Sequence, residues 1–158
     1  RDCLYVTKNR KAEQDQDSLN DLIEAILRLL EADCIRHDIT LTVDLGLIPD
    51  LFLDEKEMRQ IVLNLTRNGV EAMSPGGHLE IRTFTEGKMV ILAVRDQGDG
   101  IKPEILDKIG TPFFTTKDQG TGLGLAVCYS IAARHNAKID VETGPEGTTF
   151  SVKFAVMT

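Results

Sequence analysis

The chain has few cysteines and no excess of positive charge. Its three cysteines, Cys3, Cys34 and Cys128, are far apart and lack CxxC spacing, so the sequence predicts neither a disulfide framework nor a zinc site. This usage fits a reducing compartment such as the cytoplasm. The formal net charge of -7 argues against a nucleic-acid partner, because such proteins need a broad basic surface for the phosphate backbone. Any phosphate must therefore be bound at a local site.

The chain also lacks a long apolar run. No stretch approaches the roughly 18 apolar residues that cross a bilayer, and residues 1–17 are polar and charged, unlike a signal peptide. The 158 residues, 42% of them hydrophobic and 27% charged, suffice for one globular domain with a full core. We expect a soluble cytoplasmic domain over residues 15–158, and we interpret residues 1–14 as the remnant of an upstream helical hairpin or linker. Membrane anchoring of the longer protein is left open.

The spacing of apolar residues changes between helical and strand periods along the chain. Recurrence every three to four residues predicts helices over residues 18–33, 55–73 and 122–136. Alternation predicts strands over residues 39–44, 79–83, 90–94, 139–141 and 150–154, the last four forming two hairpins. Residues 97–121 form a long glycine-rich loop, a type that is usually functional. We therefore expect an α+β fold, a two-layer α/β sandwich in which a mixed, mainly antiparallel sheet packs on about three helices.

A polar stripe runs along the predicted second helix. Gln60, Asn64 and Asn68 recur at every fourth position and so share one face. A neutral amide oxygen can ligate a hard cation such as Mg2+, which suits a metal held mainly by phosphate oxygens and water. Glu71 lies beside this stripe and either binds a metal or pairs with Arg67. A solvated helix face is the alternative for the amides taken alone, and the motifs further along the chain decide against it.

Two glycine-rich segments are placed where a ligand could approach the backbone. Residues 96–100, Asp-Gln-Gly-Asp-Gly, directly follow a predicted strand, so a flat group could lie close to the main chain there. Residues 120–125, Gly-Thr-Gly-Leu-Gly-Leu, open a helix whose N–H groups can hold phosphates. This is neither a P-loop nor a dinucleotide fingerprint, because no Gly-Lys-Ser/Thr follows and Leu125 occupies the third glycine position. Lys117 could reach a terminal phosphate or remain a solvated lysine.

Four motifs in order resemble the catalytic domain of sensor histidine kinases. They are residues 64–73, 96–100, 113–117 and 120–125, which match the asparagine, first glycine, phenylalanine and second glycine boxes. The wider superfamily includes gyrase, the heat-shock chaperone ATPases and the mismatch-repair ATPases. With a closing Gly-Thr-Thr-Phe at residues 147–150, the resemblance covers about residues 15–156.

The resemblance implies that the chain binds ATP and Mg2+. Asn68 would ligate the metal, Asn64 would contact the phosphate region, and Lys117 would join them as a catalytic residue. Asp96 would accept a hydrogen bond from the exocyclic amine of adenine, whereas guanine presents a carbonyl there. The other expected nucleotide contacts are Gly98, Gly100, Ile101, Phe113, Phe114, Gly120, Thr121, Gly122, Leu123, Gly124, Leu125 and Thr148.

Three residues depart from the family pattern, and a fourth stays outside the expected site. Gly69 stands where the family usually has alanine. Asn136 and Ala137 follow His135 where two glycines are usual, and we expect His135 to be structural.

The resemblance implies phosphoryl transfer to a histidine on a separate helical hairpin, where an acidic residue and then a proline follow that histidine. Neither His37, His78 nor His135 has this context. We therefore expect the acceptor on a dimerisation domain absent from this chain, so that the chain binds ATP without autophosphorylating. A response regulator would act downstream, and the full-length protein would be a homodimer, whereas the chain alone could be monomeric.

Two alternatives were weighed against this function. A serine kinase of the anti-sigma-factor type belongs to the same superfamily and stays open. A degenerate module that only docks partners is disfavoured because Asn68, Asp96 and the glycines are present. The gyrase and chaperone branches resemble one another in placing a water-activating glutamate where this chain has Asn64, so attack by water is not specifically promoted here.

Overall fold

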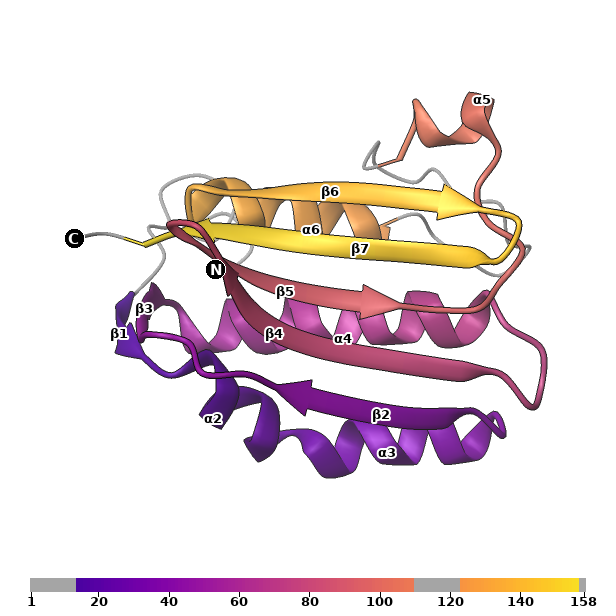
Figure 1. Ribbon diagram of the computed structural model, residues 1–158, viewed down its shortest axis with the longest axis horizontal. Coiled ribbons are helices and arrows are strands. Elements are labelled where there is room, and N and C mark those ends of the chain that lie inside the picture. Colours follow the sequence, from indigo (N-terminus) through magenta and orange to yellow (C-terminus); the bar gives the residue numbers. More distant parts are fainter. Residues whose placement is uncertain (1–13, 110–122, 157–158) are drawn as a thin grey trace, which may run out of the picture.

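A computed structural model describes residues 14–109 and 123–156 of the chain. It has two layers, a five-stranded sheet with helices on one face (Figure 1). The elements in chain order are β1 (Asp15–Asp17), α2 (Leu19–Ala25), α3 (Leu27–Arg36), β2 (Thr40–Leu45), β3 (Leu51–Leu53), α4 (Glu55–Glu71), β4 (His78–Glu86), β5 (Met89–Arg95), α5 (Pro103–Leu106), α6 (Leu123–Arg134), β6 (Ala137–Gly144) and β7 (Gly147–Ala155). The expected α+β sandwich is confirmed.

The main sheet has the strand order β2-β4-β5-β7-β6. β2 runs parallel to β4, and every other neighbouring pair is antiparallel, so the sheet is mixed and mainly antiparallel as predicted. The β4–β5 and β6–β7 hairpins are the two that the alternation predicted. Ile81 and Phe150 both lie opposite Val94, so buried apolar side chains of successive strands form rows beneath the helices.

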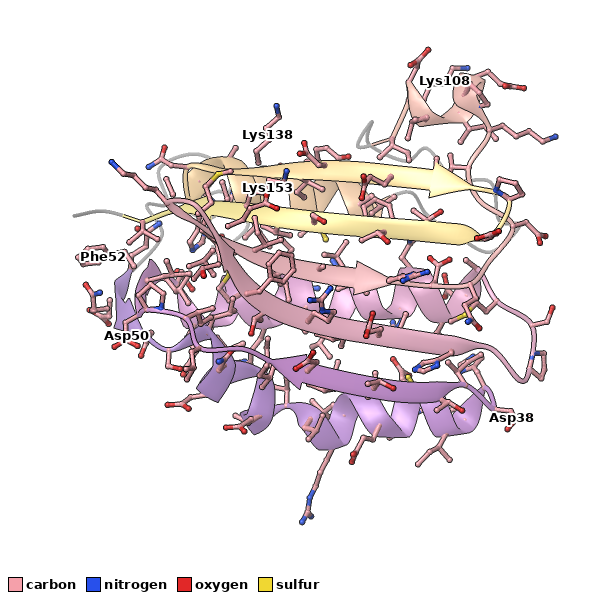
Figure 2. The ribbon with its side chains drawn as sticks, in the orientation of Figure 1. Asp38, Asp50, Phe52, Lys108, Lys138 and Lys153 are labelled. Carbon is pink, nitrogen blue, oxygen red and sulfur yellow. The ribbon has the colours of Figure 1, made fainter. Side chains whose placement is uncertain are left out.

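The opposite face of the sheet is mixed, because Ile91 and Ala93 of β5 are buried on it between charged residues of the neighbouring strands, Lys153 and Arg82. Lys153 lies on β7 on the side away from the helices (Figure 2), and its Nζ is 2.8 Å from Asp140 Oδ2 on β6. The hydrogen bond with Lys153 lowers the pKa of Asp140 below its usual value. Along β7 the less buried residues, such as Lys153, alternate with buried Val152 and Phe154. One face of this strand therefore packs on the core and the other does not.

Helix α4 runs through the middle of the helical layer. Asp54 caps its N-terminus by accepting a hydrogen bond from the Glu57 N–H at 3.1 Å. Met58, Ile61 and Leu65 form a fully buried stripe against the sheet. Helix α6 packs beside α4 on the same face (Figure 1). The exposed edge of α4 is therefore the part that carries the amide stripe.

Two predictions about the N-terminal part were incomplete. The single helix expected over residues 18–33 is two helices, because Ile26 has φ −109° and ψ 11° and separates α2 from α3. Ile26 is itself buried, so the apolar stripe continues across the break and its period gives no sign of it. Residues 15–17, for which no strand was predicted, pair antiparallel with β3 through their backbone. Within residues 14–109 and 123–156, no helix is long and apolar enough to cross a membrane.

Candidate functional site

The carboxylate of Asp96 lies where β5 ends and β7 begins. Asp96 is buried, and its Oδ1 accepts hydrogen bonds from the Gly98 N–H at 2.8 Å and the Thr148 N–H at 3.2 Å. The Asp96 N–H in turn donates to the Thr148 carbonyl at 2.9 Å. Two backbone segments that are far apart in the sequence therefore hold this carboxylate in one orientation.

A second set of hydrogen bonds continues from Thr148 into the following loop. The hydroxyls of Thr148 and Thr143 are 2.8 Å apart, and Thr143 Oγ1 accepts from the Ile101 N–H at 2.8 Å. Ile101 and Thr148 were predicted site residues, and the structure brings them together. Thr143 was missed, although it lies opposite Thr148 in the predicted β6–β7 hairpin.

Glycines allow these segments to approach each other. Gly100 has φ +87°, and a Cβ there would overlap the carbonyl oxygen of Gly144. A Cβ on Gly98 would lie 2.6 Å from the carbonyl oxygen of Ala72 at the end of α4. Gly147 has φ +144°, and a Cβ there would overlap the carbonyl oxygen of Asp96. The loop of residues 97–101 is therefore packed between α4 and the β6–β7 hairpin.

We expect the Gly147→Ala substitution to destabilise the domain. Its Cβ must displace the Asp96 backbone while the residue keeps a left-handed φ, for a cost of about 2 kcal/mol. In a domain of this size that lowers Tm by about 4 to 8 °C. Gly76→Ala is the matched control, because Gly76 also has a positive φ, of +97°, but a Cβ there meets nothing within 4 Å. Equal thermal shifts for the two variants would contradict the steric argument.

Helix α4 passes next to Asp96 at Gly69. A Cβ on Gly69 would lie 3.5 Å from Asp96 Cβ and only 2.6 Å from Leu79 Cδ1. Gly69 therefore lets α4 approach the sheet at the position of the carboxylate. The low helix propensity of glycine does not by itself indicate this close approach. Because Asn68 directly precedes Gly69 and is half-buried, the structure places Asn68 and Asp96 at the same end of the domain.

Asn64, one turn earlier on α4, contacts the first turn of α6. Its Nδ2 donates to the Gly124 carbonyl at 3.2 Å, and its Oδ1 accepts from Gln60 Nε2 at 2.9 Å. The predicted stripe thus faces the start of the helix that the second glycine-rich segment opens. Leu125, one residue further on, is partly buried and packs against the core.

Several predicted site residues cannot be placed. Phe113, Phe114, Lys117, Gly120, Thr121 and Gly122 lie outside the described residues. Leu123 is the first residue of α6. Their proposed contacts therefore remain predictions from the sequence.

Glu71 lies on the side of α4 that faces α3. It lines a surface pocket together with Asp33, Arg36, His37, Arg67 and Val70. Arg67 Nη2 is 3.8 Å from Asp33 Oδ2, so the partner of Arg67 in the structure is on α3. Glu71 and Arg67 therefore both lie on the α3 side of the helix. Among the described residues, no group of three or more His, Cys, Asp or Glu side chains could hold a metal ion.

His135 has a structural role, as predicted. It is buried, and its Nε2 accepts a hydrogen bond from the Asp54 N–H at 3.0 Å, which requires that nitrogen to carry no proton. Its Nδ1 is 2.9 Å from the Ile131 carbonyl and can donate to it. His135 therefore ties the end of α6 to the start of α4.

A partly buried ion pair holds the same two helix ends together. Arg134 Nη2 is 2.6 Å from Glu57 Oε2, and the Arg134 carbonyl accepts from Gln14 Nε2 at 3.2 Å. No sequence pattern predicts this pair, because Arg134 and Glu57 are 77 positions apart. Helix α6 is thus fixed to α4 at its C-terminal end by charge and at its first turn by Asn64.

Two described cysteines lie in the core. Cys34 and Cys128 are free and buried, and burial raises the pKa of the Cys128 thiol to about 12. A thiol with this pKa is protonated at neutral pH and is a poor nucleophile. Both residues therefore serve as small apolar side chains of the core.

These features define a class of domain. A buried carboxylate is fixed as an acceptor at a strand end, glycines let the following loop pack between α4 and the β6–β7 hairpin, and amides line the neighbouring helix, an arrangement suited to binding a nucleotide. A profile of the family described as "Histidine kinase-, DNA gyrase B-, and HSP90-like ATPase" matches residues 53–157. The chain belongs to this family, and within it to the ATP-binding catalytic domains of histidine kinases.

Relatives and solved structures agree on that subdivision. The chain is 32% identical to sporulation kinase C of Bacillus subtilis (strain 168) over 154 residues, covering 96% of this chain and 36% of that kinase. It is 36% identical to sensor histidine kinase ZraS of Escherichia coli (strain K12), covering 85% of this chain and 29% of ZraS. The catalytic domain of histidine kinase ThkA superposes with a TM-score of 0.82 at 31% identity, covering 90% of this chain and 95% of that domain. The chain thus spans about a third of the two relatives and nearly all of one solved catalytic domain.

Proposed function

We propose that this domain binds Mg2+-ATP and donates the γ-phosphoryl group to a histidine on a dimerisation hairpin that these 158 residues do not include. The observation that carries the proposal is the fixed Asp96 carboxylate beside α4, the helix that also carries the amide stripe. The Asp96 carboxylate can recognise the adenine, and the amides of Asn64 and Asn68 can contact the phosphates and the metal. Both are supplied by rigid elements, which favours accurate positioning of the nucleotide.

Asp96 can select adenine by hydrogen-bond polarity. Its carboxylate accepts and does not donate, so it suits the exocyclic amine of adenine and opposes the carbonyl of guanine. The two backbone N–H groups that bind Oδ1 keep the carboxylate from turning away. Buried sites built on such bonds discriminate strongly, because a mismatched ligand leaves polar groups unpaired.

The residues of α4 fit a metal that the nucleotide itself brings. Asn68 would contribute a neutral amide oxygen, and the described residues offer no acidic cluster that would hold the ion without phosphate. When bound, Mg2+ would neutralise charge on the transferred phosphoryl group. Asn64, at the first turn of α6, would contact the phosphates, and Lys117 would do so from the segment before it.

None of the chain's three histidines supports a role as acceptor. His135 is buried between α4 and α6. His37 follows α3, and its Nδ1 is 2.9 Å from the Asp33 carbonyl. His78 is the first residue of β4, and its Nε2 is 2.6 Å from Thr42 Oγ1. Neither His37 nor His78 is on an exposed helix face of a hairpin. We propose that the acceptor hairpin belongs to the longer protein, which would act as a homodimer.

A response regulator is the proposed downstream partner. The neighbour ThkA was solved in complex with the response regulator protein TrrA, and this chain superposes on that kinase with a TM-score of 0.81 at 26% identity. The relatives named above are kinases, and no observation here favours the serine-kinase alternative.

Reconstitution with the missing hairpin tests the proposal. The chain is expected to bind Mg2+-ATP in isothermal titration and to incorporate no phosphate when incubated alone with labelled ATP. Addition of the longer protein's hairpin should produce acid-labile, base-stable phosphate on the hairpin, and none on a variant whose acceptor histidine is replaced by alanine. Acid-stable phosphoserine on any protein substrate, or the absence of ATP binding, would contradict the proposed function.

A further inference from the structure

A chain of three groups joins Gln60 on α4 to the first turn of α6. Gln60 Nε2 donates to Asn64 Oδ1 at 2.9 Å, and Asn64 Nδ2 donates to the Gly124 carbonyl at 3.2 Å. Gln60 is exposed, one helical turn before Asn64 and two before Asn68. No role has been given to it in the function proposed above.

The donor and acceptor in each of these two hydrogen bonds follow from the Gly124 carbonyl. The Gly124 carbonyl can only accept, so the amide nitrogen of Asn64 must face it. The amide oxygen of Asn64 then faces Gln60, and only the nitrogen of Gln60 can donate to it. One backbone carbonyl thus fixes the orientation of two side-chain amides.

This orientation decides which end of Asn64 faces the start of α6. An amide that turned over would present its oxygen there, and a phosphate oxygen would meet it with like partial charges. Because Gln60 donates to the Asn64 oxygen, Asn64 presents its NH2 group to the start of α6, where it can donate to an anion. The N–H groups at the start of α6 have the same polarity, so the two contributions act together.

We infer that Gln60 is a positioning residue for phosphate binding, which acts through Asn64 by holding its NH2 group toward the first turn of α6. The inference rests on the proposed function, because it assumes that phosphates bind at this turn. Gln60 itself touches no part of the nucleotide in this account. Its effect must therefore depend on the phosphates and vanish when Asn64 is absent.

The test compares ATP with adenosine on the whole chain. Gln60→Met keeps length, neutrality and helix propensity but removes the donor. We expect ATP binding to weaken about fivefold, the effect of losing one exposed hydrogen bond, while adenosine binding stays within about twofold. In an Asn64→Ala background, Gln60→Met should change ATP binding no further. Gln16→Met is the matched control, since Gln16 is an exposed glutamine on β1, whose Nε2 contacts the Asp50 carbonyl at 3.4 Å.

Each other outcome has a definite meaning. Wild-type affinity for ATP in Gln60→Met, with the wild-type chain binding ATP normally, overturns the inference and leaves the proposed function intact. Equal weakening for ATP and adenosine indicates a general structural defect and also overturns it. A further loss in the Asn64→Ala background shows that Gln60 contacts the nucleotide directly, which contradicts the positioning role. If the wild-type chain binds no ATP, the proposed function and this inference both fail.

Discussion

Replacement of Asp96 by asparagine is expected to weaken ATP binding about 100-fold, or about 2.7 kcal/mol. The substitution keeps the shape of the side chain but turns one of its two acceptor positions into a donor. If the remaining oxygen stays with the N–H groups of Gly98 and Thr148, the new NH2 faces the adenine amine. If the side chain turns over, the NH2 faces those backbone N–H groups. In either orientation two buried hydrogen-bond donors face each other, and neither has an acceptor.

The same substitution should also change selectivity. A side-chain NH2 at the base can donate to the carbonyl of guanine, so the preference for ATP over GTP is expected to fall along with ATP affinity. Asp99→Asn is the matched control, because Asp99 is exposed in the same loop and bears the same carboxylate. Titration of ATP and GTP into both variants, with a thermal melt of each, separates a binding effect from unfolding. Unchanged ATP affinity in a folded Asp96→Asn protein would remove Asp96 from the site.

The part of the site that could be predicted is the part encoded locally. The spacing of Gln60, Asn64 and Asn68 sets one helix face whatever the helix packs against, so the amide stripe of α4 followed from the sequence. Asp96 and Gly98 are two positions apart in the chain, and the strand before them fixes where they lie. The nucleotide site was inferred from the resemblance of four motifs in order, of which this segment is one.

The missed parts depend on contacts between distant segments. Thr143 matters because the hairpin pairs it with Thr148, and only the register shows that. Glu57 and Arg134 meet because α4 and α6 lie side by side, a packing that neither helix encodes alone. Gly69 gave a local signal, low helix propensity, but its close approach to Leu79 required the sheet to be in place. The fold layers were therefore predictable from periodicity, and the contacts between layers were not.

The Asn68→Ala substitution is expected to lower the rate of phosphoryl transfer to the acceptor hairpin by about 100- to 1000-fold, because the proposed metal ligand would be lost where charge develops. Adenosine binding should remain close to the wild-type value, since Asp96 and its backbone partners are unchanged.

Glu71→Ala is the informative control. Glu71 is on the same helix, one turn on, and lines the pocket with Arg67 on the α3 side, so its loss should change the rate by less than about threefold. Single-turnover assays over a range of Mg2+ concentrations measure both variants. Excess Mg2+ should partly restore Asn68→Ala if the amide is a ligand. A large loss in Glu71→Ala with normal transfer by Asn68→Ala would reverse the assignment and make the carboxylate the metal ligand.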